Sequence, residues 1–213
     1  MAAQPKITCA PNGPYSLRIA PEPVANLRRS SGEACVTGRT VALCRCGASQ
    51  AKPFCDGTHN KSGFSDKKIS DGANDRRVAY AGKRITVFDN RALCSHAGHC
   101  TDKLKEVFRQ HEEPWIDPDG AAMEQIIETI RKCPSGALSH AIDGVAAEAP
   151  KRAPMVTVSD HGPYEVTGGI ELAGVTFGAG ASAEHYTLCR CGHSRNKPFC
   201  DGSHWEANFR DPA

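Results

Sequence analysis

Three cysteines and a histidine lie within seventeen residues in the segment LCRCGASQAKPFCDGTH, at 43–59. The segment LCRCGHSRNKPFCDGSH, at 188–204, repeats these residue types at the same spacing. Thiolate and imidazole groups hold tetrahedral zinc or iron-sulfur clusters, and the ligand types alone do not decide between them. Structural zinc sites usually begin with two cysteines separated by two to four residues, whereas Cys-x-Cys suits two thiolates on the same iron. The candidate ligands are Cys44, Cys46, Cys55 and His59 in the first segment and Cys189, Cys191, Cys200 and His204 in the second.

The residues around these ligands also suit a metal-binding loop. Gly57 permits a tight backbone turn beside a bulky group, Asp56 is placed to cap the backbone amides that follow it, and Pro53 stiffens the approach to Cys55. Nearby basic residues either offset the charge of a metal centre or are ordinary solvated surface charges, and the sequence leaves both interpretations open. These basic residues are Arg45, Lys52, Arg190, Arg195 and Lys197.

A different cysteine pattern lies between the two segments. The stretch CSHAGHC supplies Cys94 and Cys100, and Cys133 is followed by proline. Bacterial ferredoxins hold a cluster with Cys-x2-Cys-x2-Cys and a distant Cys-Pro. In that frame Ala97 stands at the position of the middle cysteine, so this site has three thiolates.

The nature of the middle site stays open between several alternatives. Three thiolates match the three corners of a 3Fe-4S cluster, which we favour. His96 or His99 could instead ligate a fourth iron and give 4Fe-4S, and His96 lies one residue from the expected position. Both histidines could also be ordinary loop residues, and the three cysteines could be purely structural.

Apolar residues alternate with polar ones before each terminal motif, which indicates strands. The alternation continues through TVALCRC (40–46) and HYTLCRC (185–191), so each motif should begin where a strand ends. Gly-Pro-Tyr occurs before both motifs, at 13–15 and 162–164, and the first copy has the longer loop, which we place in the proline-rich stretch 20–27. The alternating residues are Tyr15, Leu17 and Ile19, and then Tyr164, Val166, Ile170 and Leu172.

The central part of the chain has a different pattern. RITVFD (84–89) predicts a strand, AAMEQIIETIRK (121–132) an amphipathic helix, and ALSHAI (137–142) a returning strand. The apolar stripe of the helix consists of Met123, Ile126, Ile127 and Ile130. Polar or Ala/Pro-rich linkers are expected at 66–77 and 144–154. The predicted fold class is α+β, with a first outer region at 1–66, a middle region at 67–152 and a second outer region at 153–213.

Composition limits the class of protein. The 213 residues include 11 cysteines, an odd number, and the N-terminal sequence has no basic and then apolar signal pattern. We therefore expect metal-ligating thiols in a reducing, cytoplasmic environment. No apolar run approaches the roughly 18 residues that a membrane helix needs. The net charge of +2 indicates neither nucleic acid nor membrane as a partner.

The terminal motifs resemble the CDGSH iron-sulfur domain of the mitoNEET family, whose signature ends in the Cys-Asp-Gly-Ser/Thr-His string found at 55–59 and 200–204. The resemblance covers roughly 9–66 and 155–211. It implies a 2Fe-2S cluster in each copy, with Cys44 and Cys46 on one iron and Cys55 and His59 on the other, and the equivalent ligands in the second copy.

The family resemblance also has implications for assembly. MitoNEET-type proteins are homodimers built by strand exchange and held to a membrane by an N-terminal anchor. This chain shows no anchor and carries both modules, which implies a monomer with an intramolecular pseudo-dimer of CDGSH modules. The segment 83–143 resembles a divergent mono-cluster ferredoxin domain, which implies a third cluster. Cys9 and Cys35 remain as buried or incidental thiols.

Three clusters in one small chain predict an electron-transfer protein that serves a redox partner protein. The alternative is a cluster carrier for an apo-acceptor protein, or a redox or pH sensor, because protons compete with iron for the histidine ligand and acid should release the cluster. We see no nucleotide-binding loop and no Ser-His-Asp arrangement, and so we do not predict an enzyme. A zinc-stapled binding module is the third class.

Overall fold

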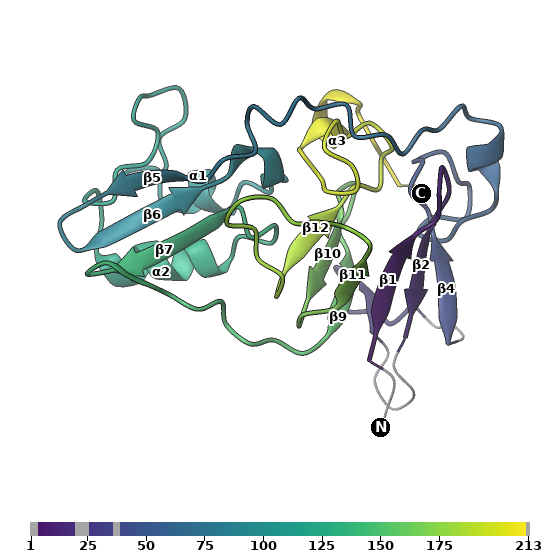
Figure 1. Cartoon of the computed structure of the whole chain (residues 1–213), viewed down its shortest axis with the longest axis horizontal. Helices are drawn as coiled ribbons and strands as arrows, with labels where there is room; N and C mark the ends of the chain where they lie inside the picture. The colour runs from purple at the N-terminus through teal and green to yellow at the C-terminus, as the bar shows by residue number, and fades with distance from the viewer. Residues whose placement is uncertain (1–3, 20–25, 36–38, 212–213) are drawn as a thin grey trace.

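The computed structural model describes residues 4–19, 26–35 and 39–211, and within them the chain forms three four-stranded sheets and few helices. This is the α+β, β-rich architecture that the sequence predicts. Figure 1 shows the sheets of the two outer regions next to each other and the middle region to one side of them. The predicted loop at 20–27 lies largely outside the described residues. No helix in the described part of the chain has the length and apolar character needed to cross a membrane.

The first outer region forms β1 (Lys6–Cys9), β2 (Tyr15–Arg18), β3 (Leu27–Arg29), β4 (Thr40–Leu43) and the short 3-10 helix η1 (Thr58–Asn60). The second forms β9 (Met155–Val158), β10 (Tyr164–Thr167), β11 (Glu171–Ala173), β12 (Tyr186–Leu188) and α3 (Ser203–Glu206). Strands β4 and β12 end immediately before Cys44 and Cys189, so the prediction that each motif begins where a strand ends is confirmed.

Each outer region contributes one strand to the sheet of the other. The first sheet has the order β11-β1-β2-β4, and β11 pairs in parallel with β1, with Leu172 opposite Ile7. The second has the order β12-β10-β9-β3, and β3 pairs in parallel with β9, with Leu27 opposite Val156. Because the backbone groups of an edge strand need partners, each exchange continues the hydrogen-bonded ladder of the other sheet.

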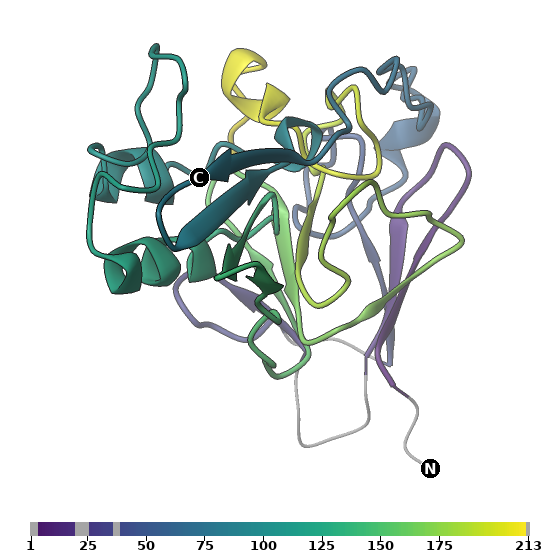
Figure 2. The ribbon, with the colours of Figure 1, turned by 60° about the vertical axis from the view of Figure 1, so that its left-hand side comes forward.

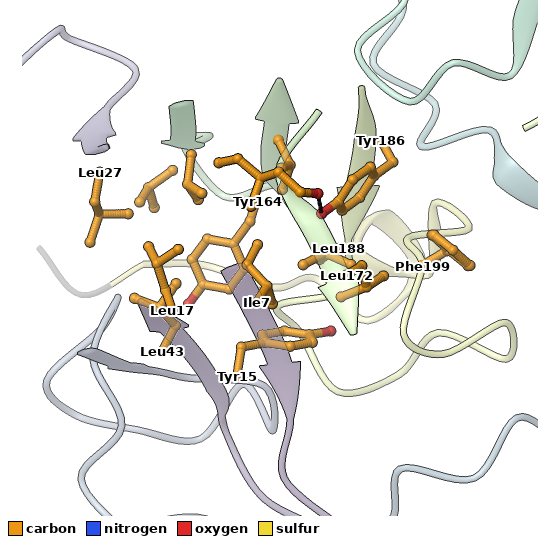
Figure 3. Packing of buried hydrophobic residues seen from close by; sticks show 14 of the residues in the cluster. Ile7, Tyr15, Leu17, Leu27, Leu43, Tyr164, Leu172, Tyr186, Leu188 and Phe199 are labelled. Atoms are coloured by element: carbon orange, nitrogen blue, oxygen red, sulfur yellow. Dashed lines mark hydrogen bonds between the residues drawn. The ribbon is translucent and has the colours of Figure 1, made fainter. Parts of the chain in front are cut away.

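The inward faces of the two sheets form one hydrophobic core. Tyr15 and Leu17 of β2 and Tyr164 and Val166 of β10 are fully buried, as the two-residue period requires. Figure 3 shows labelled residues from both outer regions within this core. The rings of Tyr15 and Tyr164 meet edge to face with centroids 6.0 Å apart, a geometry that aromatic pairs prefer.

The two buried tyrosines connect each outer region to the ligand loop of the other. The hydroxyl of Tyr15 donates to the carbonyl oxygens of Cys189, at 2.9 Å, and Pro198, at 3.0 Å. The hydroxyl of Tyr164 donates to those of Cys44 and Pro53, both at 2.9 Å. The repeated Gly-Pro-Tyr therefore supplies a reciprocal anchor across the shared core.

The middle region forms the sheet β5-β6-β7-β8, from β5 (Val78–Ala81), β6 (Ile85–Asp89), β7 (Leu138–Ile142) and β8 (Val145–Ala146). Its helical segments are η2 (Arg91–Leu93), α1 (His99–Lys103) and α2 (Met123–Arg131), and Figure 2 shows α1 and α2 beside the sheet. Strands β6 and β7 and helix α2 confirm the three predicted elements, and α2 buries Ile126 and Ile130 from the predicted stripe.

The predicted linkers fare differently. Residues 66–77 contain neither helix nor strand, as expected. The prediction of a linker at 144–154 is wrong at its start. Strand β8 pairs there with β7, and Val145 lies opposite Ile142. Two exposed residues make this strand too short to leave an alternation that the sequence would show.

Replacing Tyr15 or Tyr164 with phenylalanine should destabilise the protein and the ligand loop of the opposite region. Each change removes the donor to two carbonyl groups, and we expect the free energy of unfolding to fall by about 1–3 kcal/mol. Chemical denaturation measures this, and Tyr80→Phe in the middle region is the control. If Tyr15→Phe released metal from the loop at 43–59 earlier than from the loop at 188–204, Tyr15 would not anchor the opposite loop.

Candidate functional site

The structure brings the four candidate ligands of each terminal motif together as two close pairs. In the first motif the Sγ atoms of Cys44 and Cys46 lie 3.9 Å apart, and the Sγ of Cys55 lies 3.3 Å from Nδ1 of His59. In the second, the Sγ atoms of Cys189 and Cys191 lie 3.7 Å apart. The Sγ of Cys200 lies 3.5 Å from Nδ1 of His204.

The two pairs are held by the short β structure at the start of each motif. Leu43 forms an isolated bridge with Phe54, and Leu188 forms the equivalent bridge with Phe199. The amide of Cys44 donates to the carbonyl of Pro53, at 2.8 Å, and Cys189 makes the same bond to Pro198. The carbonyl of this proline thus accepts two hydrogen bonds in each motif. One comes from the first cysteine of its own loop and the other from the tyrosine hydroxyl of the opposite region.

Asp56 closes its ligand loop in the manner that the sequence predicts, and it also makes a second contact. Its carboxylate accepts from the amide of Thr58, at 3.0 Å, and from the amide of Gln50 across the loop, at 2.8 Å. Hydrogen bonding to the side chain of Thr58, followed by the bonds from the amides of Gln50 and Thr58, lowers the pKa of Asp56. Asp201 accepts the equivalent bonds from Ser203 and Arg195. Gly57 and Gly202 both have φ of +86°, a conformation that favours glycine.

The arginine inside each Cys-x-Cys is not a solvated surface charge. Arg190 is 1 % exposed, forms a two-bond ion pair with Asp211, and donates to the carbonyls of Ser159 and Gly162. Arg45 is also buried, and its guanidinium lies 3.4 Å from Asp66. Both arginines fasten the chain segment that follows their own motif. Lys52 and Lys197 donate to carbonyls within their loops, and Arg195 is exposed.

The two ligand loops touch each other through glycine. A Cβ on Gly47 would lie 2.3 Å from the carbonyl oxygen of Cys191, and a Cβ on Gly192 would lie 2.4 Å from that of Cys46. Both glycines have positive φ, +78° and +83°. The contact is therefore reciprocal, and it requires glycine at both positions because any side chain would overlap the opposite backbone.

The terminal sites differ in their exposure to solvent. Cys189, Cys191, Cys200 and His204 are 1, 3, 2 and 5 % exposed. In the first motif only Cys44 is buried, and the other three ligands are half-buried. The middle region explains the difference, since Asn196 donates to the carbonyl of Ala92 and the amides of Ile69 and Ser70 donate to that of Arg195.

The three cysteines of the middle region line one cavity of about 1230 Å³. Cys94 follows η2, Cys100 lies in α1, and Cys133 follows α2. Cys94 packs against the shared core of the outer regions, Cys100 against the core of the middle region, and Cys133 against both. Burial raises the pKa of Cys94 to about 12, and the thiol of Cys133 contributes to this shift despite the opposing charge of Arg91. The three thiols therefore surround the junction between the regions.

Both histidines near this site line its cavity, and both are exposed. His96 has φ of +54°, and the carbon atoms Cγ and Cδ2 of its ring lie against Gly202 of the second terminal motif. His99 begins α1 and is exposed, and Ala97 lines the cavity. Cys9 and Cys35 are half-buried and pack against the shared core.

Sequence reasoning missed Asp89, which lines the same cavity at the end of β6. It is 1 % exposed, and neither carboxylate oxygen has a hydrogen-bond partner among the described residues. The nearest cation is Arg91, whose Nε lies 3.8 Å away. Burial raises the pKa of Asp89 to about 6, against the opposing charge of Arg91. The sequence did contain a signal for it, because Asp89 continues the alternation of buried residues in the strand ITVFD.

The donor set fits an iron-sulfur cluster at each terminal motif. Within the described ranges, no three histidine, cysteine, aspartate or glutamate side chains converge as ligands of one metal ion. The ligands instead form two pairs, and backbone amides are directed at the sulfurs, from Gly57 to Cys55, at 3.5 Å, and from His193 to Cys191, at 3.4 Å. Such hydrogen bonds to sulfur are a feature of cluster sites.

Comparison with known proteins agrees with this chemistry. The family described as "Iron-binding zinc finger CDGSH type" matches residues 12–60 and 161–205, and the family described as "Divergent 4Fe-4S mono-cluster" matches residues 80–143. The uncharacterized protein YjdI of Escherichia coli K12 and its namesake in E. coli O157:H7 are each 38 % identical over 61 residues. The alignment covers 29 % of this chain and 80 % of each relative. No solved structure matches the chain significantly.

Placing alanine at Gly47 or Gly192 should disrupt both terminal sites together, because each Cβ would overlap the backbone of the opposite loop. Gly32→Ala is the matched control, since Gly32 also has positive φ but has no atom within 4 Å of the added Cβ. We expect the two loop variants to lose about 1–3 kcal/mol more unfolding free energy than the control, the usual range for overpacking. Equal losses in all three variants would show that the loops are not in contact.

Replacing Asp89 with asparagine should stabilise the protein in a pH-dependent manner. Because the pKa of Asp89 is about 4 in the unfolded chain and about 6 in the folded protein, stability falls as the pH rises from about 4 to about 6 and stays level above that, and asparagine avoids this loss. The variant should be more stable by up to about 3 kcal/mol at pH 8, and the difference should vanish below about pH 4. Denaturation across this range measures it, with the exposed Asp160→Asn as control. A difference that does not change with pH would contradict the assignment.

Proposed function

The chain belongs to the family of CDGSH-type iron-binding proteins, with two such regions around a divergent 4Fe-4S mono-cluster region, and on this basis we propose that it is a three-cluster electron-transfer protein. A 2Fe-2S cluster would be held by Cys44, Cys46, Cys55 and His59, and another by Cys189, Cys191, Cys200 and His204. The third, of the 4Fe-4S type, would be held by Cys94, Cys100 and Cys133.

The observation that carries this proposal is the pairing of ligands within each terminal loop. A two-iron cluster takes two ligands on each iron, and each loop presents one Cys–Cys pair and one Cys–His pair. A single tetrahedral zinc ion would instead need all four ligands around one point. The pairs therefore favour 2Fe-2S in both outer regions.

When bound, an iron-sulfur cluster accepts and releases single electrons, and the surrounding residues set its reduction potential. The neutral imidazole of His59 or His204 leaves the site less negative than a fourth thiolate would, which raises the potential. The amides that donate to Cys55 and Cys191 act in the same direction, because they stabilise negative charge on sulfur. Both sites are thus suited to accept electrons from a donor protein.

For the middle site, the description of the matching family favours 4Fe-4S over our preference for 3Fe-4S from the cysteine count. The three thiols line a cavity open to solvent, so the fourth iron could take a ligand other than cysteine. We further propose that the exchanged strands β3 and β11 make the outer regions an intramolecular pseudo-dimer, and that the protein works with a partner oxidoreductase and catalyses no reaction of its own.

A cluster carrier is the second candidate, and one observation favours it. Cys46, Cys55 and His59 are half-buried, so an acceptor protein could reach the ligands of the first site. The deeply buried ligands of the second site do not suit direct transfer. A carrier would therefore donate the first cluster and retain the second.

The two functions are separated by mixing anaerobically purified protein with an apo-ferredoxin and, separately, with a reductant. Electron transfer predicts seven or eight iron atoms per chain, rapid reversible bleaching and no cluster on the apo-ferredoxin within minutes. Cluster transfer from the first site, abolished by Cys55→Ser but not by Cys200→Ser, would favour the carrier instead.

Metal content and spin state complete the test. Iron and sulfide analysis with electron paramagnetic resonance of the oxidised protein identifies the middle cluster, because oxidised 3Fe-4S is paramagnetic whereas oxidised 2Fe-2S and 4Fe-4S are silent. We expect a silent oxidised protein. A colourless protein with zinc in place of iron would contradict the proposed function altogether.

A further inference from the structure

We infer that the three ligand sets form a series in which the second terminal site is the central member, joined to the middle site through His96 and to the first site through the glycine contact. This inference rests on the proposed function. It assigns to the buried site a role between two solvent-facing sites, and it assigns to His96 a positioning role that neither the motif nor the family description indicates.

The junction between the middle site and the second terminal site consists of direct packing. A Cβ on Gly202 would lie 2.4 Å from Cδ2 and 2.9 Å from Cγ of His96, so the His96 ring lies directly on the backbone of the ligand loop. Gly202 stands between the ligands Cys200 and His204, and His96 lies two residues after Cys94. Only a few bonds along the chain thus separate this contact from a ligand on either side.

Two further contacts hold this junction in place. The indole Nε1 of Trp205 donates to the carbonyl of His96, at 3.2 Å, and the Trp205 ring lies beside that of His204 with centroids 5.3 Å apart. Asn196 donates to the carbonyl of Ala92, at 2.7 Å, on the other side of Cys94. The loop of the middle site is therefore fastened to the second terminal motif both before and after its first cysteine.

The equivalent position in the first motif lacks this neighbour within the described part of the chain. Gly57 has the same φ as Gly202, but an added Cβ there would have no atom within 4 Å. The first loop instead meets the second loop at Gly47 and Gly192. Contacts therefore run from the middle site to the second terminal site and from there to the first.

Exposure follows the same order. The four ligands of the second terminal site are at most 5 % exposed, whereas the first site has three half-buried ligands and the middle site opens into the cavity. A protein partner can approach the two ends of the series but not its centre. The second cluster should therefore gain and lose its electron through its neighbours.

The test uses the reduced full-length protein and a small ferricytochrome as a one-electron acceptor, monitored by stopped flow. Each reduced cluster gives one electron to one haem iron, which becomes ferrous, and no atoms are transferred. Cys55→Ser removes the first cluster and Cys100→Ser removes the middle one. Iron and sulfide content is measured first, so that absence of clusters, a failure of the proposed function, is distinguished from a failure of this inference.

In Cys55→Ser, the second cluster should be oxidised in a fast phase through the middle cluster. Adding Cys100→Ser should abolish that fast phase. A protein that retains only the first cluster, made with Cys200→Ser and Cys100→Ser, should keep a fast phase. If Cys55→Ser does not fold, His59→Ala removes a ligand of the same cluster. Fast oxidation of the second cluster on its own would overturn the inference.

The role of His96 is tested in the Cys55→Ser background with His96→Gly, which tolerates the positive φ but removes the ring. His99→Ala is the matched control, because both histidines are exposed in the same segment but the three atoms nearest an added Cβ on Gly202 all belong to His96. We expect His96→Gly to lose the fast phase with unchanged iron and sulfide, and His99→Ala to keep it. A fast phase retained in His96→Gly would show that the ring plays no part.

Magnetic interaction between reduced clusters gives a readout that does not depend on turnover. In Cys55→Ser, the electron paramagnetic resonance signal of the second 2Fe-2S cluster should relax faster than in Cys55→Ser combined with Cys100→Ser, which also lacks the middle cluster. In Cys200→Ser, removal of the middle cluster should have a much smaller effect on the signal of the first site. Equal effects on both sites would exclude the proposed order.

Discussion

The contact between the two outer regions is the constraint on which the rest of the structure depends. Each ligand loop meets the other at a glycine, Gly47 against Cys191 and Gly192 against Cys46, and each is fixed by a tyrosine hydroxyl from the opposite region. Neither terminal motif is therefore supported by its own region alone. The repeat of the motif is a structural requirement, since each copy completes the other.

This constraint explains how a small β module can hold a cluster. Regions of about sixty residues bury little apolar surface and are only marginally stable alone, and here two of them share one core and exchange strands β3 and β11. The buried Arg45 and Arg190 then fasten the segments after each motif through Asp66 and Asp211. The middle region breaks the equivalence of the two copies, because it packs against the second loop through Ala92 and His96.

The chemistry-bearing residues could largely be predicted from the sequence, whereas their neighbours across the fold could not. The spacing of cysteine and histidine identifies both terminal ligand sets, and alternation identifies strands such as β2 and β10. Alternation determines which face of a strand is buried but not its edge partner, so the pairing of β1 with β11 appears only in the structure. The resemblance to strand-exchanged dimers predicted that strands would be exchanged, but it did not identify which strands. The contact of His96 with Gly202 and the buried Asp89 depend on tertiary packing and leave no periodic signal.

Diffraction from crystals of anaerobically purified protein, recorded on both sides of the iron absorption edge, tests the paired ligand sets most directly. The arrangement described above predicts two irons in each terminal loop, one beside Cys44 and Cys46 or Cys189 and Cys191, and the other beside the Cys–His pair. It also predicts an iron centre among Cys94, Cys100 and Cys133. A single metal peak in each terminal loop, or His59 and His204 directed away from the metal, would contradict it.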